Sequence, residues 1–168
     1  MTERKKTRLL FVDIDGVFNH DSFYHDRKDN NLPYPLSEFD PKCVERYNRI
    51  IRETGAKTII SSSWRHTKGL RNIMDRVGFC MECLDFDITP CLGTIRGLEI
   101  RSYMEDYMDN HLDEDVESYC IIDDDVDMLY TQKDNFVVCD VHNGGLTDEK
   151  AEEVINILRR KGVISWKY

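Results

Sequence analysis

An apolar strand that runs directly into two carboxylates constrains this chain more than any other feature. The stretch RLLFVDIDGV places the apolar residues 9–12 immediately before Asp13, and Asp15 and Gly16 follow. A short apolar run of this kind predicts a strand in the interior of a sheet. Carboxylates at the end of a buried strand are costly unless something binds them, because burial penalises the charged form. We therefore expect this strand to end at a binding site.

Helix and strand patterns alternate along the rest of the chain. The helix after the first strand has clear boundaries, with Asp40 as N-cap, Pro41 in the first turn and Gly55 just past the end. Strands separated by helices predict an α/β fold, a mostly parallel five-stranded sheet covered on both faces, and one domain over residues 1–168. Strands are expected at 8–13, 56–63, 83–89, 118–123 and 135–141, and helices at 40–55, 68–78, 97–111 and 147–162.

Polar residues follow three of the expected strands. The first ends in Asp13 and Asp15, the second in the run 61–65 (SSSWR), and the fourth in the three acids 123–125. In a parallel sheet these ends lie on one edge, which is the edge where open α/β sheets bind ligands. Clustered carboxylates repel one another unless a cation neutralises them, and an oxygen-only ligand set suits Mg²⁺. The pattern therefore predicts a magnesium site.

The two acids of the first strand end are expected to differ in role, because Gly16 indicates a turn between strand and loop. One carboxylate could attack phosphorus as a nucleophile. The other could protonate the leaving oxygen and then activate water. A serine hydroxyl could bind a phosphoryl oxygen, and an Arg or Lys could offset the transition-state charge. Each short motif alone also suits an ordinary turn or helix cap, and only their order after successive strands favours a site.

Four short stretches match a known set of motifs in order. FVDIDGV fits an apolar strand followed by D-x-D-G-[TV], TIIS an apolar strand ending in Ser or Thr, and CIIDD a strand ending in paired Asp. The stretch GTIRGLEI supplies an Arg between the last two. Together they resemble the haloacid dehalogenase (HAD) superfamily of phosphohydrolases. SSSWR, ITP, RGLEI, IIDDDVD and GLT further resemble small HAD proteins related to the phosphatase domains of RNA-repair proteins. The resemblance covers residues 8–160.

The resemblance implies a Rossmann-like three-layer sandwich and a role for each matched residue. Asp13 would be the nucleophile that becomes an aspartyl-phosphate. Asp15 would be the general acid and base, and its backbone carbonyl would bind Mg²⁺. Ser61 would bind the phosphoryl group, with Ser62 as the alternative if the strand ends one residue later. Arg96 would orient the nucleophile and the phosphate.

The same resemblance implies a metal and substrate environment around these groups. Asp123 and Asp124 would hold Mg²⁺ together with Asp13, directly or through water. Because Asp125 is a third acid in this run, the metal-binding pair could also lie one residue later. Arg65 would contact a substrate phosphate; a surface ion pair is the alternative. Gly16 would lie at the substrate.

Residues 17–39 form the longest stretch without a helix or strand pattern. Because they follow the first strand, they are expected to lie over the site as a loop or minimal cap. The interval between the second and third motifs is too short for a cap domain, which resembles capless HAD members that act on large substrates or borrow a lid. Candidate substrate contacts in this segment, unless it packs on itself, are Phe23, Tyr24, Arg27, Lys28 and Tyr34.

The expected function is that of a Mg²⁺-dependent phosphoric monoester hydrolase that acts on nucleotides or nucleic-acid phosphate ends. The alternatives are a small-metabolite or protein phosphatase and a non-catalytic phosphate-binding module on the same fold. The net charge of −9 argues against broad, non-specific nucleic-acid binding, which depends on neutralising phosphates. The basic residues at positions 4–8 are expected to be a solvated approach to the first strand.

No apolar run approaches the roughly 20 residues of a membrane span, and no signal peptide is recognisable, so a cytoplasmic protein without a membrane partner is expected.

Cys120 and Cys139 lie in apolar runs and are expected in the core. Cys80, Cys83 and Cys91 form a weak zinc pattern without an evident fourth ligand, so packing is the favoured interpretation.

Overall fold

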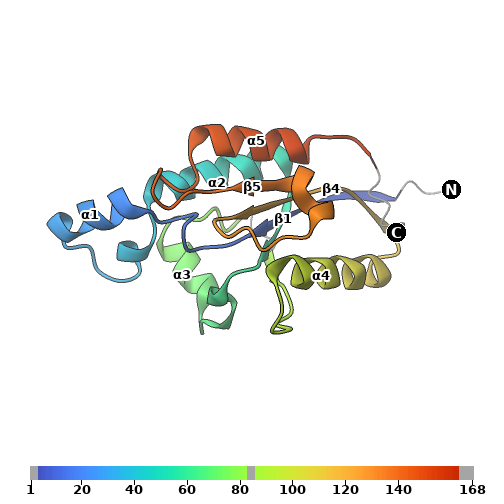
Figure 1. Ribbon diagram of the computed structural model, residues 1–168, viewed down its shortest axis with the longest axis horizontal. Coiled ribbons are helices and arrows are strands. Elements are labelled where there is room, and N and C mark those ends of the chain that lie inside the picture. Colours follow the sequence, from blue (N-terminus) through green and yellow to red (C-terminus); the bar gives the residue numbers. More distant parts are fainter. Residues whose placement is uncertain (1–3, 83–85, 163–168) are drawn as a thin grey trace.

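A computed structural model describes residues 4–82 and 86–162 of the chain. In this part of the chain five parallel strands form one sheet in the order β3-β2-β1-β4-β5 (Figure 1). The α/β class and the parallel sheet predicted from the sequence are confirmed. The strands are β1 (Lys5–Val12), β2 (Lys57–Ile60), β3 (Phe86–Ile88), β4 (Glu114–Asp123) and β5 (Phe136–Val138).

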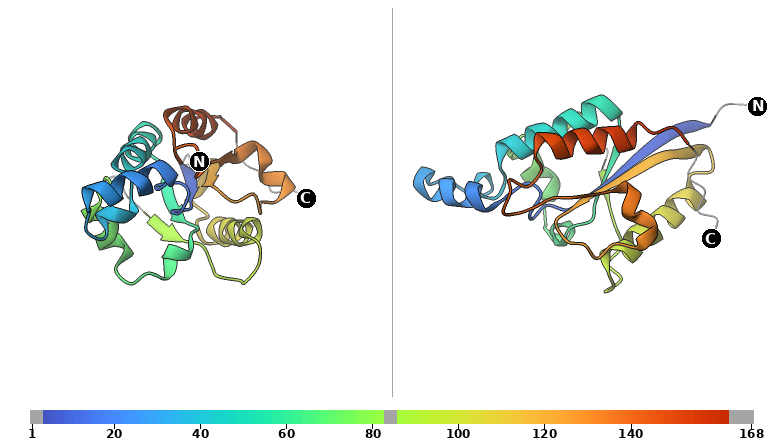
Figure 2. Two further views of the ribbon diagram at one scale, coloured as in Figure 1. Left: turned by 60° about the vertical axis from the view of Figure 1, so that its left-hand side comes forward. Right: turned by 45° about the horizontal axis from the view of Figure 1, so that its top comes forward.

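Helices cover both faces of the sheet and complete three layers (Figures 1 and 2). The side chains of α2, α3 and α5 share one hydrophobic cluster with one face, and those of α4 share a second cluster with the other. Among the described residues, no helix has the length and apolar character needed to cross a membrane. The helices are α1 (Asp21–Asn30), α2 (Pro41–Thr54), α3 (Leu70–Arg76), α4 (Arg96–Asn110) and α5 (Asp148–Leu158), and the short 3₁₀ turns are η1 (Leu36–Glu38), η2 (Ser63–His66) and η3 (Tyr130–Asn135).

The central strands are buried on both faces, and their side chains alternate between the two clusters. On β1, Leu10 and Val12 pack with α2 and α5, whereas Leu9 and Phe11 pack with α4. This is the period of two that the strand pleat imposes. Cys120 on β4 and Cys139 just after β5 are buried, as predicted. The possible zinc pattern is not described as a whole, because Cys83 lies outside the described residues.

The predicted limits of β1 and β4 were wrong at their N-terminal ends. Both strands begin earlier than the apolar patterns indicated, at Lys5 and Glu114. The side chains of Arg4, Lys5 and Lys6 are exposed to solvent, as expected, but residues 5–8 already belong to β1, and acids of β4 neutralise the basic cluster. Such a pairing between distant segments leaves no local apolar signal. The ion pairs are Arg4–Asp115, Lys5–Glu114, Lys6–Glu117 and Arg8–Glu117.

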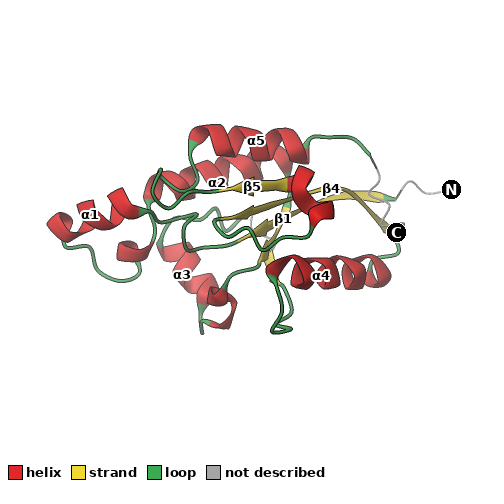
Figure 3. Cartoon of the chain, viewed as in Figure 1, coloured by secondary structure: helices red, strands yellow, loops and turns green. Residues whose placement is uncertain are grey.

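The segment 17–39 is not irregular, contrary to the prediction, because it contains α1 and η1 (Figure 3). The sequence of α1, DSFYHDRKDN, has too few apolar residues to show a helical stripe. Phe23 anchors the helix and is only 8% exposed, so it does not offer a free ring to a base. The side chains of Arg27 and Lys28 lie outside the described residues.

Candidate active site

The ends of three adjacent strands bring Asp13, Ser61 and Asp123 side by side. β1 pairs in register with β2 and β4 up to the residues just before them. The ladder continues by one more step, since the Asp13 N–H donates to the Ile122 carbonyl and the Ser61 N–H donates to the Val12 carbonyl, both at 2.9 Å. The convergence of these strand ends, which the sequence predicted, is therefore present.

Strand alternation directs these three side chains to the face that α4 covers, because they continue the rows of Phe11, Ile59 and Ile121 in the α4 cluster. Arg96 is the first residue of α4 and meets them there. Its Nη1 atom lies 3.7 Å from Asp13 Oδ1 and 3.6 Å from Asp123 Oδ2. The guanidinium thus bridges carboxylates from two strands.

The loop after β4 fixes the start of α4. The Asp127 carboxylate accepts a hydrogen bond from the Arg96 N–H at 2.9 Å, and its carbonyl accepts one from the Gly97 N–H at 3.2 Å. A Cβ on Gly97 would lie 2.5 Å from the Leu129 nitrogen, so only glycine allows this approach. Asp127 belongs to the stretch IIDDDVD, but sequence reasoning gave it no role.

Three carboxylates form the centre of the site. Asp13, Asp123 and Asp124 each offer an oxygen, and these atoms lie within 4.8 Å of one another. Burial raises the pKa of Asp13, while hydrogen bonding from Ser62 and the charge of Arg96 oppose the rise. Burial, followed by the charge of Asp13, also raises the pKa of Asp123 and of Asp124. The site therefore concentrates negative charge on two buried acids, Asp13 and Asp123, and on Asp124, which is exposed.

Three polar atoms at this site are buried and have no hydrogen-bond partner: Ser61 Oγ, Arg96 Nη1 and Asp123 Oδ2. Leaving such an atom unsatisfied costs about 1–3 kcal/mol. A cation suits the carboxylate oxygens, and an anion with several oxygens suits the hydroxyl and the guanidinium. The donor set thus fits Mg²⁺ together with a phosphoryl group.

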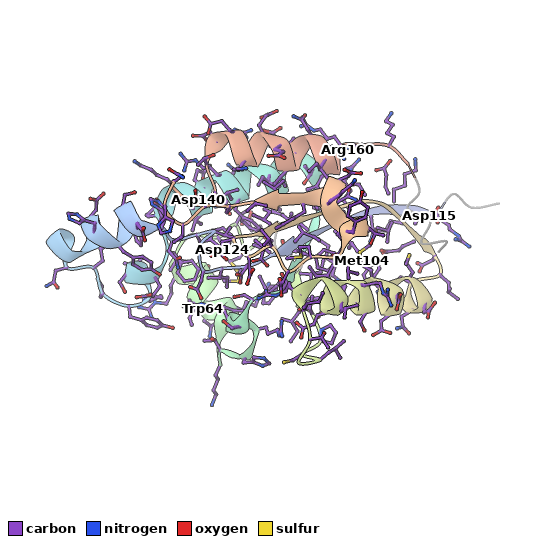
Figure 4. All side chains as sticks on the ribbon, viewed as in Figure 1. Trp64, Met104, Asp115, Asp124, Asp140 and Arg160 are labelled. Carbon is purple, nitrogen blue, oxygen red and sulfur yellow. The ribbon has the colours of Figure 1, made fainter. Side chains whose placement is uncertain are left out.

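Asp15 lies next to this centre but is bound differently. Its side chain is exposed, and the Trp64 Nε1–H donates to its Oδ2 at 3.0 Å. Asn19 donates to the other oxygen, Oδ1, at 3.2 Å. Figure 4 shows Trp64 and Asp124 at the end of the sheet nearest α1, opposite Asp115 at the start of β4. The two acids of the first motif therefore have different surroundings, as the turn at Gly16 indicated.

Comparison with known protein families then identifies the family of this chain. The family described as "HAD domain in Swiss Army Knife RNA repair proteins" matches residues 9–151. The chain belongs to this family. The resemblance inferred from the motifs is confirmed, as is the Rossmann-like fold without a large cap domain. No curated protein and no solved structure matches the chain.

In this HAD domain, the run after β2 contributes both to the site and to its support. The Ser62 hydroxyl accepts from the Trp64 N–H at 3.3 Å and caps η2. Arg65 forms a buried ion pair with Glu99 at 2.9 Å and donates to Thr89 Oγ1 at 3.1 Å. The ion pair considered as the alternative role of Arg65 is therefore present, but it is buried and not at the surface. The phosphate contact of Arg65 stays a prediction.

A second cluster of the HAD domain, His20, Asp40 and Cys43, was not predicted. His20 Nε2 lies 2.7 Å from Asp40 Oδ2, and these three side chains are close enough to share a metal ion. The Phe23 N–H, however, points at His20 Nδ1 at 3.4 Å, so Nδ1 accepts and Nε2 carries the proton toward Asp40. These hydrogen bonds therefore connect His20, just before α1, to Asp40, the N-cap of α2.

Proposed function

We propose that this HAD domain is a Mg²⁺-dependent phosphoric monoester hydrolase that acts on phosphorylated RNA ends through an aspartyl-phosphate at Asp13. Membership of the HAD superfamily supports a phosphohydrolase. The observation that carries the rest of the proposal is the position of Arg96 Nη1 between the Asp13 and Asp123 carboxylates. Ser61, whose buried hydroxyl has no hydrogen-bond partner, lies at the neighbouring strand end.

Asp13, Asp123 and Asp124, with the backbone carbonyl of Asp15, would hold Mg²⁺. The fit rests on the close approach of the three carboxylates and on the buried, unpartnered Asp123 Oδ2. When bound, Mg²⁺ would neutralise these carboxylates and part of the phosphoryl charge. Burial is the main cause of the raised pKa values of the three acids, and a bound cation would oppose it by favouring their charged forms.

Two displacements at phosphorus complete the proposed reaction. First, an Asp13 oxygen bonds to phosphorus, the bond from phosphorus to the leaving oxygen breaks, and the Asp15 carboxyl gives its proton to that oxygen. Second, Asp15 takes a proton from water, the water oxygen bonds to phosphorus, and the bond to Asp13 breaks. Inorganic phosphate leaves, and both acids return to their starting states.

Ser61 and Arg96 are proposed to bind the phosphoryl oxygens. Both have a buried polar atom without a hydrogen-bond partner, so a phosphoryl group would accept hydrogen bonds that these donors do not otherwise make. Ser62 interacts with Asp13 and caps η2, which favours Ser61 as the second-motif residue. Gly16 and Arg65 stay as predicted substrate contacts.

An RNA end is the proposed substrate because the family is named for RNA repair proteins and because the site, at the carboxyl ends of the central strands, has the exposed acids Asp15 and Asp124. The net charge of −9 favours recognition of an end over binding along the backbone.

The test is phosphate release with Mg²⁺ from a panel of substrates. The panel contains 3′- and 5′-phosphorylated oligoribonucleotides, a mononucleotide, a sugar phosphate, a phosphopeptide and 4-nitrophenyl phosphate, with Asp13→Asn as the matched control. We expect an oligoribonucleotide to be the best substrate and the variant to be inactive. A preference for the sugar phosphate or the phosphopeptide would show that the substrate is a small metabolite or a protein and not an RNA end. Oligonucleotide binding without release from any compound would indicate a non-catalytic module.

A further inference from the structure

We propose that Trp64 is a positioning residue whose indole N–H holds Asp15 in place to protonate the leaving group. The inference rests on the function proposed above, because it assigns Asp15 as the general acid. It adds a residue outside the four motifs and gives the second strand end a second task, beyond the phosphate-binding serine.

Two donors from different parts of the chain fix the Asp15 carboxylate. Trp64 Nε1–H donates to Oδ2 at 3.0 Å, and Asn19 Nδ2 donates to Oδ1 at 3.2 Å. With one donor on each oxygen, the carboxylate can neither rotate nor shift without breaking a hydrogen bond. Asn19 is itself immobile, since it is 1% exposed and bonds to the Gly16 N–H at 2.9 Å and to the Glu38 carbonyl at 3.2 Å.

Trp64 is held as firmly as the group it positions. Its backbone N–H donates to the Ser62 hydroxyl at the start of η2. Its ring packs edge-on against Phe39, with centroids 5.3 Å apart and an interplanar angle of 72°. Phe39 is 1% exposed and anchors this contact in the core. The indole therefore brings Asp15 into a fixed relation with the strand end that holds Ser61 and Ser62.

This arrangement suits an acid that must reach a leaving group at the protein surface. Asp15 is exposed, so packing does not hold its carboxyl, and its hydrogen bonds must do so. A displacement of about 1 Å at a catalytic group can cost about a hundredfold in rate. The loss should be large only where the leaving oxygen needs a proton. An alkoxide from a ribose needs one, whereas 4-nitrophenolate leaves readily without one.

The test compares two substrates in one variant. Trp64→Phe removes the N–H and retains an aromatic ring against Phe39, and Trp64→Leu serves as a second variant if the first does not fold. The readout is kcat/KM, which covers the steps up to departure of the leaving group. Phe39→Leu is the matched control, because it weakens the ring packing and leaves the indole N–H in place.

We expect Trp64→Phe to lower kcat/KM for the phosphorylated oligoribonucleotide by about tenfold to a hundredfold. For 4-nitrophenyl phosphate the loss in kcat/KM should stay within about threefold, which corresponds to a free energy smaller than that of a typical hydrogen bond. Phe39→Leu should lower the melting temperature and leave the ratio between the substrates unchanged.

Equal losses on both substrates, or no loss on either, would overturn the positioning role of Trp64 while leaving the proposed function intact. A changed substrate ratio in Phe39→Leu would also overturn it, since packing alone would then explain the effect. Failure of the proposed function is a separate result, because the wild-type protein would then release no phosphate from either substrate.

Discussion

The α-carbon of Gly16 faces the carboxyl group of Asp124 so closely that a Cβ at Gly16 would lie 2.3 Å from Asp124 Cγ. Gly16 also has a φ of +71°, a conformation that side chains with a Cβ rarely adopt. The first-motif turn and the fourth-motif acids therefore fit together only if this residue is glycine. This contact links the two ends of the site that are most distant in sequence.

Gly16→Ala is expected to lower phosphate release by at least about tenfold, because the new Cβ forces the Asp124 side chain out of the carboxylate centre. A tenfold loss in rate corresponds to about 1.4 kcal/mol in the activation free energy. Gly55→Ala is the matched control. Gly55 has a φ of +63°, but no atom lies within 4 Å of the position that its Cβ would take, so it carries the backbone penalty of about 1 kcal/mol without the clash. Full activity in Gly16→Ala would show that Asp124 is not needed in its present place.

The buried ion pair between Arg65 and Glu99 allows the two proposed roles of Arg65 to be separated. Arg65→Met should destabilise the protein by about 3–5 kcal/mol, because it leaves Glu99 buried without its partner. Adding Glu99→Leu should recover much of that stability in urea unfolding. If Arg65 also contacts the substrate phosphate, the stable double variant will have a raised KM. An unchanged KM in the double variant would leave Arg65 with a structural role alone.

The sequence predicted the site better than it predicted what supports the site. Asp13, Ser61 and Asp123 could be found because each follows an apolar strand, and parallel pairing then places them together. The Trp64–Asp15 and Arg65–Glu99 contacts could not be found, because nothing local distinguishes these side chains from ordinary surface residues. Helix α1 was missed for a related reason: its polar sequence is held by Phe23 rather than by an apolar stripe.

Glu114 should make the stability of the protein depend on pH. Hydrogen bonds from Lys5, Tyr107 and Thr7 lower the pKa of Glu114 to about 2, from an ordinary value of 4.5. A lowered folded-state pKa means that the stabilisation is complete above about pH 4.5 and is lost as the pH falls toward 2.

Glu114→Gln should therefore reduce the free energy of unfolding by about 2 kcal/mol at pH 7, the scale of hydrogen bonds to a charged group. The difference from wild type should shrink steadily below pH 4.5. Urea unfolding of both proteins at several pH values measures it. A difference that is constant across this range would contradict the ionic origin of the effect.

Mg²⁺ should raise the melting temperature of the wild-type protein but not that of Asp123→Asn. A ligand at 100 times its Kd stabilises the folded state by about 2.7 kcal/mol. Without metal, the variant should be at least as stable as wild type at neutral pH, because burial and Asp13 disfavour the Asp123 charge. An equal Mg²⁺ response in both proteins would place the metal elsewhere.

Ca²⁺ should inhibit activity, since it takes more ligands at longer distances.

Trapping of the phosphoenzyme tests the central claim most directly. The protein is mixed with Mg²⁺ and a substrate carrying a labelled phosphoryl group, quenched in acid within one turnover, and digested with pepsin in acid, where an acyl phosphate persists. We expect the label in a peptide that contains Asp13, and none in that peptide from Asp13→Asn. Labelled phosphate released without any labelled peptide, or the same peptide labelled in Asp13→Asn, would contradict the assignment of Asp13 as the nucleophile.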